Sequence, residues 1–188
     1  MDVLKYKKIE NFLSESEVEL LAAYCRLRSR FPSKGNIIWD NKPSPTDQKV
    51  YGTANFKFNF GRDIIMESLL LLKQKKVEEI VGEELWPTYS FWRPYFLGNS
   101  LPKHKDRPSC EVSISVCIEK DIDWPLYMDG EPVNLEPGDG ALYAGVDCEH
   151  YREKFKGDYH AQCFLHYVRK NGLYKDFKYD KRIFIGAT

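Results

Sequence analysis

The stretch Tyr95-Phe-Leu-Gly-Asn-Ser-Leu-Pro-Lys-His-Lys-Asp106 joins a turn signal to two residue types that commonly bind metals. Gly98 and Asn99 favour a tight turn. In an extended chain, positions i and i+2 project from the same face, so His104 and Asp106 can hold one ion together. A third ligand from a distant strand would complete a facial triad with open positions, the geometry that suits non-haem Fe(II).

This stretch lies in a β-rich region that follows two predicted helices. A capping box at Ser14-Glu-Ser-Glu17 begins a helix that runs to about Arg30. A second helix is predicted from about Asp63 to Val81, with Gly82 ending it. Short runs rich in aromatic and β-branched residues then predict strands near 88–96, 110–118, 124–128, 141–146, 150–155, 159–168 and 182–186. Two helices followed by short strands predict a mainly β protein, a jelly roll backed by N-terminal α-helices.

Residues 31–60 differ in composition from the predicted helix on either side of them. Prolines and glycines interrupt any long element there, and aromatic residues are scattered among them. A loop of this length in a compact domain is usually functional or mobile, so a flap is one interpretation. An irregular wrap around the core with one or two short strands is the other.

Two predicted strands carry polar but mostly uncharged residues on one face. In Cys110–Ile118, four aliphatic residues share one face, while Glu111, Ser113, Ser115 and Cys117 share the other. In the strand around 160–166, one face similarly presents His160, Gln162, Phe164 and His166. Such a face lines a cavity or meets solvent, and the pattern leaves both possibilities open.

Composition limits the class of protein and its setting. The chain has 188 residues, 43% of them hydrophobic, which predicts one domain, with 1–85 as helical support and 86–188 as the jelly-roll core. Its 28 basic residues balance 28 acidic ones, so the chain lacks the net positive charge that attracts a protein to nucleic acid or to a membrane surface. Five cysteines without a C-x-x-C pair indicate buried free thiols in a reducing compartment. With no apolar leader at the N-terminus, we expect a soluble cytoplasmic protein.

The order of motifs resembles that of prolyl-4-hydroxylase-like Fe(II)/2-oxoglutarate oxygenases of the small bacterial or phage type. Tyr95-x-x-Gly98 followed by His104-x-Asp106 is similar to the family's Tyr-x-x-Gly…His-x-Asp run, and Leu135–Tyr143 is similar to the turn and strand that lead to its distal histidine. His150 stands where that histidine is expected. The resemblance implies a double-stranded β-helix that holds Fe(II) through His104, Asp106 and His150, with 2-oxoglutarate and O₂ as co-substrates.

The co-substrate anchor departs from the family pattern. The family holds the far carboxylate of 2-oxoglutarate with an Arg or Lys about ten residues after the distal histidine, and His160 occupies that position here. Arg152 is a second candidate, because it should face the same side of the strand as His150 and offers a planar fork that fits a carboxylate. Tyr95 matches a family position whose hydroxyl often touches the co-substrate. The hypothesis is that His160 and Tyr95 contact 2-oxoglutarate while Arg152 lines the pocket.

The resemblance implies a dioxygenase that hydroxylates a C–H bond, with a peptidyl or free amino acid such as proline as the best-fitting substrate. An oxidative demethylase of alkylated nucleic acid is an alternative that the neutral charge disfavours. A jelly-roll binding or scaffold protein without turnover is the alternative from another class. Basic and aromatic residues alternate near 174–184, and we interpret them as a solvated terminal strand rather than a nucleic-acid surface.

Overall fold

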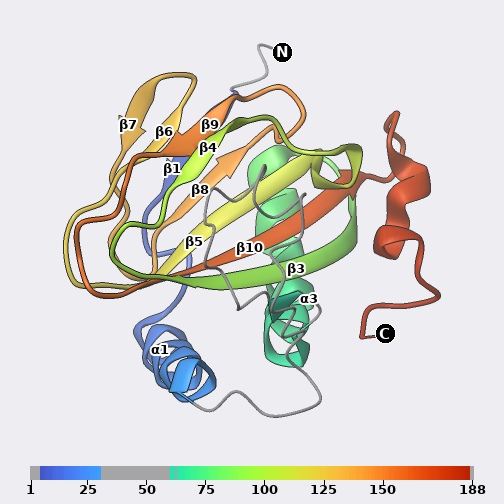
Figure 1. The fold of residues 1–188 in the computed structure, drawn as a ribbon. Coiled ribbons are helices and arrows are strands. Elements are labelled where there is room, and N and C mark those ends of the chain that lie inside the picture. The colour runs from blue at the N-terminus through green and yellow to red at the C-terminus, as the bar shows by residue number, and fades with distance from the viewer. Residues whose placement is uncertain (1–4, 31–59, 62, 187–188) are drawn as a thin grey trace, which may run out of the picture.

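Two antiparallel sheets and two helices make up the fold in the computed structural model, which describes residues 5–30, 60–61 and 63–186 (Figure 1). The larger sheet has the strand order β1 (Tyr6–Ile9), β8 (Gly140–Tyr143), β5 (Val112–Lys120), β10 (His160–Arg169), β3 (Leu85–Tyr95) and β2 (Phe60–Gly61). The smaller sheet has the order β4 (Leu101–His104), β9 (His150–Arg152), β6 (Leu126–Met128) and β7 (Glu131–Val133). These two sheets form the predicted mainly β jelly roll, a double-stranded β-helix with N-terminal helices.

Both predicted helices are confirmed, together with the signals at the start of each and at the end of the second. Helix α1 (Glu15–Arg30) begins with the capping box, in which the Ser14 backbone N–H donates to the Glu17 carboxylate at 2.7 Å. Helix α3 (Ile64–Val81) begins at Asp63, whose side chain accepts from the backbone of the second residue of the helix. It ends at Gly82, whose φ of 77° lies in the left-handed region that glycine adopts without strain.

The helices cover one face of the larger sheet, and the other face forms the barrel interior (Figure 1). The aliphatic face of β5, represented by Ile114 and Val116, is completely buried in the core that includes α1 and α3. On the opposite face, Ser113, Ser115 and Gln162 are at most 1% exposed. The polar face of β5 and β10 therefore lines the interior rather than meeting solvent, which resolves the two possibilities that the pattern left open.

The C-terminal strand predicted at 182–186 is wrong. The chain there follows a short 3-10 segment, η2 (Lys175–Lys181), and continues as a turn. One physical reason is an ion pair: Arg182 donates to the Glu67 carboxylate of α3 at 2.6 Å, which directs the chain toward the helix. The edge of β3 beyond β10 is also already paired with β2.

Three short strands outside the 31–60 segment were not predicted, and the proposed flap falls almost entirely outside the described residues. Strands β1, β4 and β7 have three or four residues each, and they contain lysine, proline or glutamate in place of a run of aromatic and β-branched residues. The 31–60 segment lies, apart from Phe60, outside the described residues.

All five cysteines belong to the described part and are buried free thiols, as predicted. Within the described residues, no helix has the length and apolarity needed to cross a membrane.

Candidate metal centre and the buried network beside it

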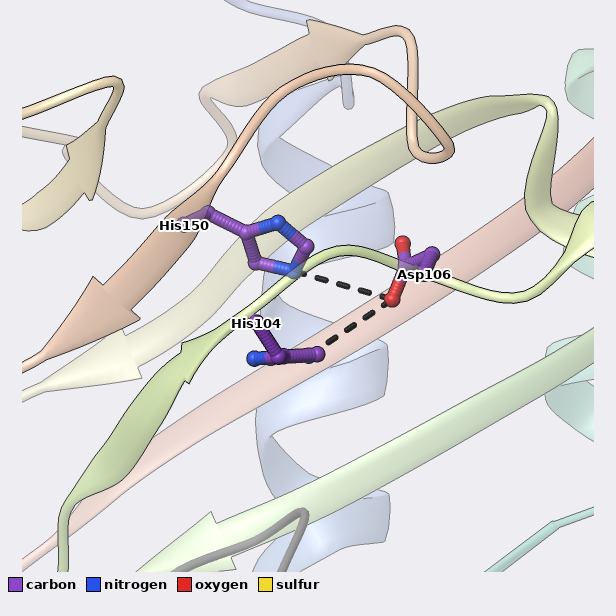
Figure 2. A group of neighbouring side chains, drawn as sticks. All are labelled: His104, Asp106 and His150. Carbon is purple, nitrogen blue, oxygen red and sulfur yellow. Dashed lines mark ion pairs between the residues drawn. The ribbon is translucent and has the colours of Figure 1, made fainter.

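Strand pairing in the smaller sheet brings the three predicted metal ligands together (Figure 2). His104 ends β4 and is the register partner of His150, which begins the neighbouring strand β9. Asp106 follows β4 by two residues, and its Oδ1 lies 3.6 Å from Nε2 of His104 and 3.7 Å from Nε2 of His150. One ligand atom of each residue lies within 4.8 Å of the others. The predicted His104, Asp106 and His150 cluster thus exists in the fold.

Backbone carbonyls orient both imidazoles. Nδ1 of His104 is 2.8 Å from the carbonyl oxygen of Pro102, and Nδ1 of His150 is 3.1 Å from that of Cys148. A carbonyl only accepts, so each Nδ1 must carry the hydrogen in these contacts. In the neutral rings, the lone pair of each Nε2 then points toward Asp106, which is the tautomer that a metal ligand requires.

Asp106 is held by its side chain and its backbone. The Tyr143 hydroxyl of β8 donates to Oδ2 at 3.1 Å, which leaves Oδ1 for the two histidines. The Asp106 backbone N–H donates to the Gly145 carbonyl at 2.8 Å. A Cβ atom at Gly145 would lie 2.1 Å from the Cys110 carbonyl oxygen and 2.9 Å from Oδ2 of Asp106, so only glycine fits this approach.

Burial and the interactions among the three side chains shift the pKa of each one. Burial alone would raise the pKa of Asp106, but the adjacent histidines lower it below the usual value. Burial alone would also lower the pKa of His104, yet Asp106 and the Pro102 carbonyl raise it. For His150, burial dominates and its pKa is lowered. The cluster thus combines an ionised carboxylate with a histidine that burial keeps neutral.

The donor set fits a divalent transition metal. The N···O separations of 3.6 and 3.7 Å are too long for hydrogen bonds. Metal–ligand bonds of about 2.1 Å would place neighbouring ligand atoms roughly 3.0–3.4 Å apart, so a small inward movement of the side chains suffices. Two imidazoles and one carboxylate are the ligands of the facial triad that leaves coordination positions open.

A small cavity lies against this cluster, and His104, Asp106 and His150 all line it. Its wall on β3 and β10 is aromatic and includes Tyr89, Phe91 and Phe164. The Phe91 and Phe164 ring centroids are 5.3 Å apart, and His166 packs on Tyr89 at 4.5 Å. His166 therefore packs in the cavity wall beside Tyr89.

A buried arginine, Arg152, does not line this cavity but is the register partner of Leu101, which does. Arg152 is 3% exposed, and its guanidinium lies 4.5 Å from the Trp124 ring centroid. Its Nη1 donates to the Trp124 carbonyl, and its Nη2 donates to Oε1 of Gln162 at 3.2 Å. Both acceptors are neutral, and within the described residues no carboxylate forms an ion pair with Arg152. Burial lowers its pKa, as expected for a cation without an anionic partner.

His160 shares the same glutamine but has a different electrostatic state. Its Nε2 is 2.7 Å from Oε1 of Gln162, while the amide nitrogen of Gln162 donates to Ser115 at 2.9 Å. Nε2 of His160 therefore carries the hydrogen, and its buried Nδ1 has no hydrogen-bond partner among the described residues. Burial and the charge of Arg152 lower the pKa of His160 to about 3. The imidazole is consequently neutral at physiological pH.

Tyr95 joins the cavity to this network. It lines the cavity, is 1% exposed, and packs edge-on against Trp124 with ring centroids 4.9 Å apart. The predicted residues therefore form two adjoining groups: His104, Asp106 and His150 at the cavity, and Arg152 with His160 behind Tyr95. Sequence reasoning missed Tyr143 and the bridging role of Gln162. The position of Gln162 between His160 and Phe164 on the polar face was a signal for it, whereas nothing local marks Tyr143.

Comparison with known proteins gives matches only at the level of structure. No protein-family model matches the chain. No curated protein matches it either. The apo form of EctD from S. alaskensis matches with a TM-score of 0.66 and 15% identity, covering 96% of this chain and 79% of that one.

Two hydroxylase structures match over similar lengths. The 2-oxoglutarate complex of a viral collagen prolyl hydroxylase from Paramecium Bursaria Chlorella virus-1 has a TM-score of 0.58 and 12% identity, covering 87% of this chain and 95% of that one. A prolyl-4-hydroxylase from Pseudomonas putida has a TM-score of 0.60 and 16% identity, covering 88% and 92%. The chain therefore has the fold of the Fe(II)/2-oxoglutarate oxygenases, which confirms the resemblance at the level of fold.

Proposed function

We propose that this protein is an Fe(II)- and 2-oxoglutarate-dependent dioxygenase that hydroxylates a C–H bond. The observation that carries the proposal is the convergence of Nε2 of His104 and Nε2 of His150 on Oδ1 of Asp106. That convergence occurs in a fold whose solved examples include one with bound Fe and others with 2-oxoglutarate. When bound, Fe(II) with 2-oxoglutarate and O₂ supplies the oxidising chemistry, and the protein supplies binding and orientation.

In this proposal the triad holds the metal from one side. The carbonyls of Pro102 and Cys148 keep each Nε2 unprotonated, and Tyr143 orients the carboxylate of Asp106. Coordination positions on the cavity side then stay available for co-substrate. The aromatic wall of Phe91 and Phe164 would keep water from the reacting centre and hold the substrate against it.

For the far carboxylate of 2-oxoglutarate, the contacts favour Arg152 over His160. Arg152 is a buried cation whose described hydrogen-bond acceptors are neutral, so an entering carboxylate would supply the missing counter-charge. His160 already uses its one N–H on Gln162, and its remaining nitrogen can only accept. A carboxylate is itself an acceptor, so a neutral His160 cannot anchor it. We therefore propose Arg152 as the anchor, with His160 orienting Gln162.

Tyr95 would complete the co-substrate pocket. The cavity reaches Tyr95 and Leu101, and Leu101 is the register partner of Arg152 across β4 and β9. A movement of these two side chains would connect the metal position with the guanidinium. Tyr95 would then lie along the co-substrate with its hydroxyl near it, as its position in the family pattern implies.

The substrate in this proposal is a peptidyl or free amino acid such as proline. The support is the match to two structures described as prolyl hydroxylases, together with a cavity whose wall is mainly aromatic. Aromatic rings pack well against an apolar ring or chain, and such packing would hold one carbon atom of the substrate near the metal position.

Succinate formation tests this function. Purified protein would be incubated with Fe(II), 2-oxoglutarate and O₂, with and without proline and prolyl peptides, and compared with Asp106→Ala. We expect succinate from the wild-type protein, more of it when a substrate is present, and product that has gained one oxygen atom. Asp106→Ala should form none. Absence of succinate from metal-loaded wild-type protein under every condition would instead support a scaffold.

A further inference from the structure

A run of backbone strain occurs near the C-terminus, far along the chain from the metal ligands. Tyr179, Asp180 and Lys181 have φ values of 55°, 53° and 62°, and none of them is glycine. Left-handed conformations are unfavourable for such residues, so they persist only where surrounding contacts determine them. The contacts in this case lead directly to the metal centre.

The side chain of Asp180 explains why the strained turn is retained. Its Oδ1 and Oδ2 accept from Nη1 and Nη2 of Arg107, each at 2.9 Å, which makes a two-bond fork. The Asp180 side chain is 13% exposed and that of Arg107 is 51% exposed. Arg107 directly follows Asp106 in the chain, so these two hydrogen bonds restrain the metal-ligand loop at the residue next to the ligand.

Arg107 also packs on the wall of the cavity. Its guanidinium carbon lies 4.6 Å from the ring centroid of Tyr89, and the Tyr89 hydroxyl is 3.2 Å from Sγ of Cys110. The guanidinium is therefore held by Asp180 and by the face of an aromatic ring, and an arginine is better suited than a lysine to both contacts. These contacts leave the Arg107 side chain little freedom.

The loop that carries Asp106 depends on such side-chain contacts. Asp106 lies between the end of β4 and the short 3-10 turn η1 (Pro108–Cys110), outside the ladder of the sheet. Its backbone N–H bonds to Gly145, and its carboxylate bonds to Tyr143. The Arg107 fork adds a restraint on the residue that follows.

The far side of the turn is anchored to the core. Arg182 donates to the Glu67 carboxylate at 2.6 Å and to the Thr88 carbonyl at 3.0 Å, and the Gly186 N–H also donates to Glu67. Glu67 is 1% exposed. Figure 1 shows this C-terminal segment against the ends of β3 and β10. The strained turn thus connects the packed core to the metal loop.

We propose that Asp180 is a positioning residue for the metal centre, acting through Arg107 to hold the Asp106 loop in the geometry that binds the ion. The inference rests on the proposed function only in taking His104, Asp106 and His150 as metal ligands. It assigns to the C-terminal segment a role that no sequence motif indicated.

Titration with Co(II) alone tests this role. Binding would be measured by calorimetry and by the visible absorption of Co(II), which reports its ligand geometry, for the wild type, Asp180→Ala and Asp180→Asn. We expect about tenfold weaker binding and an altered spectrum for Asp180→Ala, as is typical when a group supporting a metal ligand is lost. Asp180→Asn retains one acceptor and should fall between the two. Arg107→Lys keeps the charge without the fork and should also weaken binding.

Glu119→Ala is the matched control. Glu119 is 15% exposed and pairs with Arg26, which is 60% exposed, so this pair resembles Asp180–Arg107 but joins α1 to β5. Its loss should leave Co(II) affinity and spectrum unchanged. Wild-type binding in both Asp180 variants would overturn the proposal, and if Asp180→Ala does not fold, Asp180→Asn and Arg107→Lys decide it. A wild-type protein that binds no Co(II) would instead contradict the metal site itself.

Discussion

The Tyr143 hydroxyl donates to Oδ2 of Asp106 at 3.1 Å, so a strand of the larger sheet orients a ligand carried by a loop that follows a strand of the smaller sheet. Burial, together with the negative charge of Asp106, holds the pKa of Tyr143 well above its usual value, so the hydroxyl stays protonated and remains a donor. The metal centre is therefore built across the two sheets.

Replacement of Tyr143 by Phe should weaken metal binding. The ring would remain, but Oδ2 of Asp106 would lose its donor and the carboxylate would be free to rotate. Loss of such a supporting hydrogen bond typically lowers metal affinity by about tenfold or more. Calorimetric titration with Mn(II) measures the effect, with Tyr151→Phe, on the same smaller sheet as His150, as the control. Unchanged affinity in Tyr143→Phe would show that Gly145 and the histidines alone orient Asp106.

Replacement of Arg152 separates the two candidate anchors. Arg152→Lys should raise the KM for 2-oxoglutarate at least about tenfold, because lysine keeps a charge but not the fork. His160→Gln should raise it less, because glutamine can still donate to Gln162. Succinate formation at varied 2-oxoglutarate concentration measures both values, with the exposed Lys103→Ala as control. A larger effect in His160→Gln than in Arg152→Lys would return the anchoring role to His160.

Replacement of Gly145 by Ala should disrupt the metal loop. The added Cβ would overlap the Cys110 carbonyl and press on Asp106, so the loop must move. We expect a lower melting temperature and loss of most Mn(II) affinity. Gly98→Ala is the control, since its Cβ meets nothing within 4 Å but its φ of 85° imposes strain. That variant should lose roughly 1–2 kcal/mol of stability and keep the metal site. Equal metal affinity in both variants would contradict the prediction.

Acid should destabilise the protein partly through His160. Its folded-state pKa of about 3 lies below the ordinary value of 6.5, so between these values the unfolded chain binds a proton that the folded chain does not. The free energy of unfolding therefore falls as the pH falls through this range. One such group contributes a slope of at most about 1.4 kcal/mol per pH unit.

His160→Gln should flatten that acid slope. Urea unfolding at a series of pH values between 6.5 and 4 measures the difference from wild type. His166, whose pKa burial lowers to about 4, should keep part of the slope in the variant. Parallel curves for wild type and His160→Gln would show that His160 accepts a proton in the folded state.

Local sequence predicted the elements with strong end signals and clear periodicity. Both helices begin at their predicted caps and α3 ends at Gly82, and the alternation in β5 and β10 distinguished the residues that face the helices from those that face the interior. Strands β1, β4 and β7 were missed although β6, β8 and β9 are equally short, because the missed strands contain lysine, proline or glutamate in place of aromatic and β-branched residues. The 182–186 strand was wrong because the Arg182–Glu67 ion pair is a long-range contact that no local pattern contains.

By itself, the sequence determined which residues were available as metal ligands and in what order they occur, and the two-residue spacing of His104 and Asp106 suggested that they could share one ion. Only the tertiary structure decided how they are supported. Pairing of β4 with β9 brought His150 to His104, and close approach at Gly145 fixed the Asp106 loop. Chain folding placed the guanidinium of Arg152 beside neutral acceptors, and burial kept His160 neutral. These features depend on distance and desolvation between segments far apart in the chain, which spacing along the sequence does not encode.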